Sequence, residues 1–315
     1  MDRLAYALRR LAQLVPVAVG VTLVTFLLVR LLPGDPAFAV LGQRATPQLV
    51  AQLHHKWGLD QSLPEQYWLF VQRLAHGDLG DSYLYRLPVR ELVLERVPVT
   101  LLLLAYSTVL ALLIAVPLAT LAARRKDGPV DHVARALPVV GLGMPAFWVG
   151  LMLIILFAAG DVFKAFPVGG YGNGFTGHIK SLFLPALTVA IGTAPLLIRS
   201  LRASLLGVLE ADFITTARAK GLPERRVLIR HGLRNSVMPM ITVLGINLGF
   251  LIGGTVVVEK VFALPGLGAL IFDGVLQRDF SIVQGVTLVF AAFVVLVNVV
   301  IDLTYSVLDP RVRFD

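Results

Sequence analysis

Long runs without a charged residue dominate this sequence and restrict what it can fold into. Of its 315 residues, 57% are hydrophobic and only 15% are charged, against about 25% charged in an ordinary soluble domain. A helix that crosses a bilayer needs about 20 mostly apolar residues. Six runs without Asp, Glu, Lys or Arg have about this length: Leu11–Val29, Val97–Ala123, Ala136–Gly160, Ser181–Ile198, Asn235–Val258 and Phe280–Ile301. The sequence predicts an all-α, polytopic membrane protein with six transmembrane helices.

The basic residues between these runs predict how the chain is oriented. If both termini are cytoplasmic, the segments on that side carry the entire net charge of +8, as the positive-inside rule requires. The first run ends at Arg30 without a small-residue cleavage site, so we expect a retained transmembrane helix rather than a signal peptide. The basic charge then indicates contact with membrane lipid, and no nucleic acid is expected as a partner.

The connecting segments differ in length, and their positions predict the domain organisation. Residues 1–32 form an N-terminal tail and the first span, and residues 33–96 form an extracytoplasmic loop with short helices. Residues 97–315 form the core domain, which includes a basic cytoplasmic segment at 199–235. The apolar positions of Pro88–Pro98 predict a short helix that lies along the membrane interface before the second span.

The contents of the spans argue against several classes of function. An ion-coupled pump normally carries a charged residue inside the membrane, and none lies within these runs. The chain has no cysteine and none of the G-x-S-x-G, H-E-x-x-H or G-x-x-x-x-G-K-[ST] motifs, so we expect neither an enzyme nor a metal site. An autonomous channel or a secondary transporter stays open. In the fifth span, Gly245, Gly249 and Gly253 predict a ridge for close helix packing.

The basic cytoplasmic segment carries the clearest functional signal. Glu210–Lys220 suits a helix, Gly221 stands where a left-handed cap belongs, and Pro223 stops the helix two residues later. A second helix then places Arg226, Arg230 and Arg234 in one stripe at α-helical spacing. The pattern suits either a lever that another protein moves or a segment held by anionic lipid.

This segment resembles the coupling loop, known as the EAA loop, of permease subunits in bacterial ATP-binding-cassette (ABC) importers. The resemblance follows the peptide-importer form, because Thr215 and Thr216 stand where the general pattern begins Glu-Ala. Its other residues here are Asp212–Ile214, Ala217–Gly221, His231, Leu233–Asn235 and Pro239. Further blocks resemble the B-type permease of dipeptide and oligopeptide importers: Leu31–Pro36, Gly77–Gly80, Ser82, Pro88, Val89, Arg96–Leu101, Glu259, Val261, Phe262, Pro265–Gly268, Arg278 and Asp279.

The resemblance implies a type I ABC importer permease fold and half of a translocation path for di- or oligopeptides. A related importer of nickel, glutathione or another small solute is the alternative. The implied partners are a homologous C-type permease, two cytosolic ATPase subunits that bind ATP and Mg, and an extracytoplasmic solute-binding protein. No cofactor is expected in this chain, and the protein belongs in the bacterial inner membrane.

The resemblance also implies which residues act. Those expected at the ATPase are Asp212, Thr216, Ala217, Arg218, Ala219, Lys220, Gly221 and Leu222. Those expected at an outer gate, or at the docking site of the binding protein, are Glu259, Pro265, Gly266, Gly268, Arg278 and Asp279. For Arg278 and Asp279, a local ion pair is the competing interpretation.

Overall fold

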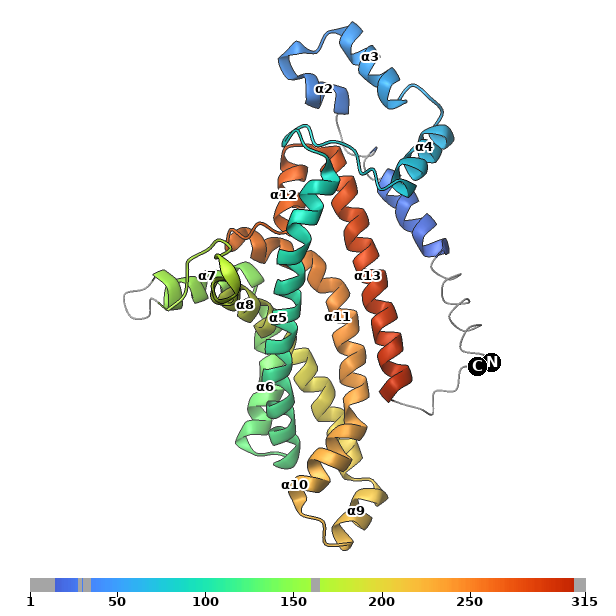
Figure 1. Ribbon diagram of the computed structural model, residues 1–315. Helices are drawn as coiled ribbons and strands as arrows, with labels where there is room; N and C mark the ends of the chain where they lie inside the picture. Colours follow the sequence, from blue (N-terminus) through green and yellow to red (C-terminus); the bar gives the residue numbers. More distant parts are fainter. Residues whose placement is uncertain (1–14, 28–29, 31–34, 160–164, 309–315) are drawn as a thin grey trace. The chain divides into compact units, whose positions relative to one another are not determined.

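The computed structural model describes residues 15–308 except 28–29, 31–34 and 160–164 (Figure 1). Helices make up most of this part of the chain, and its only β pairing is an isolated bridge between Asp81 and Pro88. The described residues form two compact units. The first unit combines residues up to Pro98 with Gly266–Leu296, and the second combines Val99–Pro265 with the residues from Val297 onward.

Four helical stretches are long and apolar enough to cross a membrane. They are Val89–Arg124 (α5), Gly174–Leu209 (α8), Glu224–Val261 and Phe280–Ile301. The third comprises α10 (Glu224–Arg226), the π-helix η3 (Val227–Leu233) and α11 (Arg234–Val261), and the fourth lies in α13 (Phe280–Leu308). These stretches contain the second, fourth, fifth and sixth predicted spans. The first predicted span is helical over Val15–Leu27, and its ends lie outside the described residues.

The third predicted span is interrupted, which differs from the expected continuous helix. The structure has α6 (Pro129–Gly143), then α7 (Ala146–Ile154) and the π-helix η2 (Ile155–Ala159). The break lies at Met144 and Pro145, whose backbones are extended. Because proline disfavours the α conformation in the residue before it, α6 ends there. Pro138 lies inside α6 and does not end it.

The predicted interfacial helix at Pro88–Pro98 is wrong in its extent. Val89 begins α5, and the helix continues without a break through Pro98 to Arg124. The predicted apolar face is nevertheless buried: Val89, Leu92 and Val93 pack with Leu270 and Ile282 in the core of the first unit. Because α12 (Leu267–Leu276) and the start of α13 cover these residues, this end of α5 is held by protein.

Short helices occupy the segment before α5, as the sequence predicts. They are α2 (Pro36–Leu41), the 3-10 helix η1 (Gly42–Arg44), α3 (Pro47–Trp57) and α4 (Leu63–Ala75). Thr46 caps α3 by accepting a hydrogen bond from the Leu49 amide, and Gly58 ends it with a φ of 69°. Ser62 and Glu65 form a capping box at the start of α4.

Helix α8 lies at the centre of the second unit. In its most apolar stretch 72% of residues are buried, against 39% or less in the other three candidate spans, so the neighbouring helices pack around it. Alanines spaced at one helical turn in α5, among them Ala111, Ala115 and Ala119, belong to the same buried apolar cluster as Ala190 and Ala194 of α8. Such small residues let two helices approach closely.

Candidate functional site

A short two-sided helix, α9 (Asp212–Ala219), follows α8 at the predicted coupling segment. Its inner side chains, Ile214 and Ala217, are buried against Val227 and Leu222. The opposite face is exposed and consists of Asp212, Phe213, Thr215, Thr216, Arg218 and Ala219, followed by Lys220. The apolar positions three residues apart bind α9 to the following helix and leave most of its surface to solvent.

The turn after α9 has the left-handed conformation that the sequence predicts at Gly221. Its φ is 74°, the Gly221 amide donates to the Arg218 carbonyl at 2.9 Å, and the Leu222 amide donates to the Ala217 carbonyl at 3.3 Å. These two bonds form a Schellman motif. Among the described residues beyond its chain neighbours, none has an atom within 4 Å of a Cβ added at Gly221. The requirement for glycine therefore comes from the backbone angle rather than from crowding.

An ion pair crosses the same turn. The Arg218 Nη2 atom donates to Glu224 Oε1 at 2.8 Å and the Nε atom donates to Oε2 at 3.2 Å, joining the end of α9 to the start of α10. Both side chains are nearly half exposed, at 45% and 46%. Solvent therefore screens the attraction, and the pair orients the turn more than it stabilises the fold.

We expect that replacing Arg218 by glutamine lowers the free energy of unfolding by less than about 1 kcal/mol. Thermal denaturation of the purified protein measures this change. The charge-swapped double variant Arg218→Glu with Glu224→Arg restores opposite charges at the two ends of the turn. It should therefore recover the loss. A loss above that range that the swap does not reverse contradicts an exposed pair.

The π-helical segment η3, which follows α10, contacts two other helices. In η3, Gly232 lies so close to α8 that an added Cβ would meet Leu205 at 3.2 Å and Leu209 at 3.4 Å. Leu228 of η3 packs with Leu205 and with Ala123 of α5. The segment that holds α9 is therefore packed directly on α8 and α5.

The predicted stripe of Arg226, Arg230 and Arg234 needs correction in its geometry. All three are exposed, but η3 lies between the first and the last of them. In a π-helix the hydrogen bonds run from i to i+5, so each turn holds more residues than in an α-helix. The α-helical spacing used to align the arginines does not hold across this segment.

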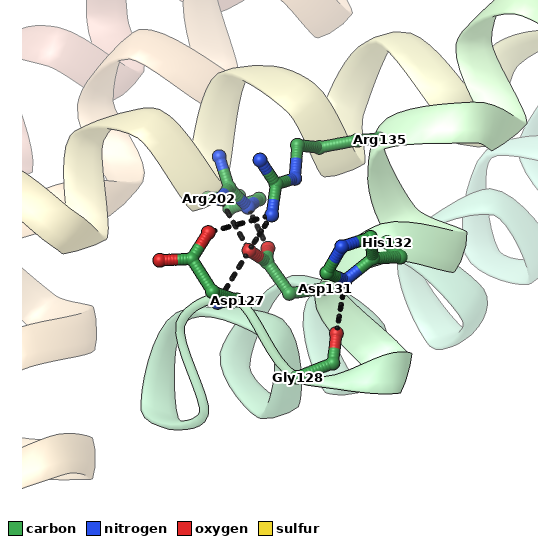
Figure 2. A network of polar contacts seen from close by, with 6 residues as sticks. All are labelled: Asp127, Gly128, Asp131, His132, Arg135 and Arg202. Atoms are coloured by element: carbon green, nitrogen blue, oxygen red, sulfur yellow. Dashed lines mark hydrogen bonds and ion pairs between the residues drawn. The ribbon is translucent and has the colours of Figure 1, made fainter.

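A buried carboxylate near this region escaped the sequence interpretation. Asp131 of α6 is fully buried and accepts hydrogen bonds from Arg202 of α8, from Arg135 Nη2 at 2.9 Å and from the Asp127 amide at 2.9 Å (Figure 2). Arg135 also binds the Asp127 carboxylate at 2.8 Å. The network ties the α5–α6 connection to α8. The Arg202 guanidinium holds the pKa of the Asp131 carboxyl well below its usual range.

The predicted outer-gate residues in the second unit are Glu259 and Pro265. Glu259 is fully buried in α11, which runs one turn further than the predicted span and so includes this acid. Its Oε1 atom accepts a hydrogen bond from Thr100 Oγ1 of α5 at 2.7 Å. Pro265 is exposed. The hydrogen bond between Thr100 and Glu259 therefore links α5 to α11 within this unit.

The remaining outer-gate residues lie in the first unit. Gly266 is the N-cap of α12, and Gly268 is buried inside that helix. Arg278 is exposed with a φ of 58°, whereas Asp279 is fully buried. The Asp279 carboxylate accepts hydrogen bonds from Ser82 Oγ at 2.7 Å and from the amides of Leu84 at 3.2 Å and Ile282 at 3.3 Å. Asp279 thus caps α13 and anchors the loop before α5.

We expect the substitution Asp279→Ala to loosen this loop, because it leaves a buried hydroxyl and two amides without their acceptor. Each unsatisfied buried group costs about 1–3 kcal/mol. Limited proteolysis of the purified protein should then cut residues 81–87 faster than in the parent. Arg278→Ala, the exposed neighbour, serves as the control and should leave the cutting rate unchanged. Equal rates for the Asp279 variant and the parent would refute the anchor.

The three glycines of the predicted packing ridge have different surroundings. Gly245 is buried, and an added Cβ would lie 2.1 Å from Ile301 Cδ1 of α13. Gly249 is half-buried, and Gly253 is exposed with no atom of the described residues within 4 Å of an added Cβ. Gly245 is therefore in a tight packing contact within the described part of the chain, and Gly253 is not.

The sequence matches known families over nearly its whole length. Residues 115–314 match the family described as binding-protein-dependent transport system inner membrane component, and residues 3–104 match its N-terminal family. The chain is 37% identical to the oligopeptide transport system permease protein AppB of Bacillus subtilis over 98% of this chain and 99% of that protein. It is 36% identical to the dipeptide transport system permease protein DppB of Escherichia coli K12, with the same coverage.

A solved structure shares the fold at low sequence identity. It is an inward-facing conformation of the MetNI methionine ABC transporter, with a TM-score of 0.55 and 16% identity over 69% of this chain and 96% of that one. This likeness confirms the all-α permease fold. Together with the family matches over nearly the whole sequence, it shows that the chain belongs to the binding-protein-dependent transport system inner membrane component family.

Proposed function

We propose that this chain is one of two membrane subunits of an ATP-driven peptide importer, and that α9 is its contact with a cytosolic ATPase. The observation that carries the proposal is the construction of α9: one face is packed on the helix that leads into α11, and the other is exposed. Relatives that match 98% or more of this chain are named as oligopeptide and dipeptide permeases, which supports peptides as the cargo.

The contacts of α9 support a mechanical role. A force on its exposed face passes through Ile214 and Ala217 to Val227 at the start of the next helix. From there, Leu228 and Gly232 press on α8, and Leu228 also presses on α5. Because packed side chains resist compression, a displacement of α9 moves the ends of these helices with it.

The energy for this movement comes from outside the chain. ATP and Mg bind to the ATPase subunits, and ATP shifts the equilibrium only if it interacts differently with the two states. In our proposal, closure of an ATPase pair pushes α9, and the translocation path changes from inward-open to outward-open. A homologous C-type permease supplies the other half of the path, and an extracytoplasmic binding protein delivers the peptide.

This role requires α9 and both termini to lie on the cytoplasmic side. The distribution of basic residues supports that orientation, because it leaves the net charge of +8 on the side of α9. Most of the predicted coupling residues are then available to the ATPase. The exceptions are Ala217, which is buried, and Leu222, which is half-buried and packs with it, and both act by holding α9 in place.

Reconstitution tests the proposal against an autonomous channel or secondary transporter. Proteoliposomes that contain both permease subunits, the ATPases and the binding protein should take up a labelled dipeptide only when ATP is present. Proteoliposomes with this chain alone should show no uptake above protein-free vesicles. Uptake by the isolated chain, or uptake in the full system without ATP, would refute the proposed role.

A further inference from the structure

A crevice between α6 and α8 combines apolar walls with arginines. Its volume is about 300 Å³. The apolar lining includes Pro138 and Val139, and the Val139 side chain is 78% exposed. The guanidinium groups come from Arg135, Arg199 and Arg202. This lining lies in the second unit and does not include α9.

The charges around the crevice do not cancel. Arg135 and Arg202 are held by Asp131, and Arg135 also binds Asp127 (Figure 2). Arg199 is exposed, and among the described residues no ion pair or side-chain hydrogen bond involves it. Three guanidinium groups and two carboxylates therefore leave one excess positive charge, and two of the arginines are already fixed in position.

The crevice also lies where a lipid headgroup meets the acyl region. Arg199 directly follows the charge-free run Ser181–Ile198 of α8, and Val139 lies near the start of the charge-free run Ala136–Gly160. The arginine is therefore at one end of an apolar stretch of membrane-spanning length. Arginine at that depth binds phosphate groups well because its planar guanidinium donates several hydrogen bonds at once.

We propose that this crevice binds an anionic phospholipid. Arg199 donates hydrogen bonds to the headgroup phosphate, and the exposed Val139 contacts the first carbons of an acyl chain. The single excess charge favours a net-negative lipid over a zwitterionic one, because a choline or ethanolamine group offsets the phosphate charge. The apolar walls favour a lipid over free phosphate. The proposal depends on α6 and α8 and not on the coupling role of α9.

Native mass spectrometry of the detergent-purified importer complex, titrated with phosphatidylglycerol, tests this site. Loss of one charge-assisted contact should weaken binding about tenfold in the variant Arg199→Gln. The matched control is Arg125→Gln, which removes an exposed arginine of the adjacent α5–α6 connection that does not line the crevice. Its affinity for phosphatidylglycerol should equal that of the parent, and phosphatidylcholine should bind the parent more weakly.

Three results would overturn the proposal. Equal weakening in both arginine variants means a general attraction between basic residues and anionic lipid. An unchanged affinity in the Arg199 variant places the bound lipid elsewhere. If inorganic phosphate displaces the bound lipid as effectively as added phosphatidylglycerol does, the crevice binds a free anion instead of a lipid. As a second variant, Val139→Asp should weaken lipid binding and leave phosphate competition unchanged, which tests the acyl contact separately.

Discussion

Substitution of Asp131 by alanine is expected to lower the free energy of unfolding by about 3 kcal/mol. The carboxylate is fully buried and is the shared acceptor of Arg202, Arg135 and the Asp127 amide. Its removal leaves Arg135 and Arg202 in a cluster that has lost the negative charge they both bind. It also releases the α5–α6 connection from α8.

Thermal denaturation of the detergent-purified protein measures this loss. The variant Asp131→Asn removes the negative charge while keeping nearly the same side-chain shape, so it separates the two effects. The asparagine variant should lose most of the same stability, because an amide is neutral and donates where a carboxylate accepts. Ala136→Ser, an exposed position in the same helix, serves as a neutral control. If both Asp131 variants have the same melting temperature as the parent, the network contributes nothing to stability.

The pH dependence of the Asp131 contribution has a definite sign. Because Arg202 lowers the pKa of this carboxyl in the folded protein, the stabilisation is fully present above the unfolded-state pKa, about 3.9. It is lost as the pH falls below that value towards the folded pKa. The difference in melting temperature between parent and Asp131→Asn should therefore persist from neutral pH down to about pH 4 and shrink below it.

Substitution of Gly221 by valine is expected to reduce ATP-driven uptake about tenfold. A φ of 74° costs an ordinary side chain about 1–2 kcal/mol, which corresponds to about a tenfold shift against the native turn. A β-branched residue is disfavoured still more. Loss of this conformation breaks the Schellman bonds of Gly221 and Leu222 and changes the angle at which α9 meets the ATPase.

Uptake of labelled dipeptide and ATP hydrolysis, measured in the same proteoliposomes, test this effect. Gly221→Asn is the matched control, because asparagine tolerates the left-handed conformation and space surrounds the position. We expect the asparagine variant to retain most of the uptake, and both variants to be present in the membrane at the parent level. Full uptake by the valine variant would show that the turn is not part of coupling.

Local chemistry made the coupling segment predictable. The combination of Gly221 with Pro223 specifies a helix end, a left-handed turn and a new start, and the structure has them at these residues. Charge-free runs located four membrane-length helical stretches for the same reason, because hydrocarbon excludes unpaired polar groups. The roles assigned to the individual coupling and gate residues stay proposals.

Tertiary context decided what the sequence left open. Pro138 and Pro145 are both possible helix breakers, and only the structure shows that α6 continues through the first and ends before the second. Asp131 with Arg202, and Ser82 with Asp279, pair across 71 and 197 positions of sequence. One sequence contains no signal for such long-range partners, so Asp279 could be noted without its partner and Asp131 was missed.

Cysteine cross-linking tests the central claim most directly, because the chain has no cysteine of its own. Single cysteines at Thr215 or Ala219, on the exposed face of α9, should form an adduct with the ATPase subunit when a bifunctional thiol reagent is added to the assembled importer. A cysteine at Ala217, which is buried on the other face, should form much less of the adduct with the ATPase subunit. The account predicts this difference between faces. If Thr215→Cys and Ala219→Cys react with a soluble thiol reagent in the complex but never join the ATPase, α9 is not the coupling helix.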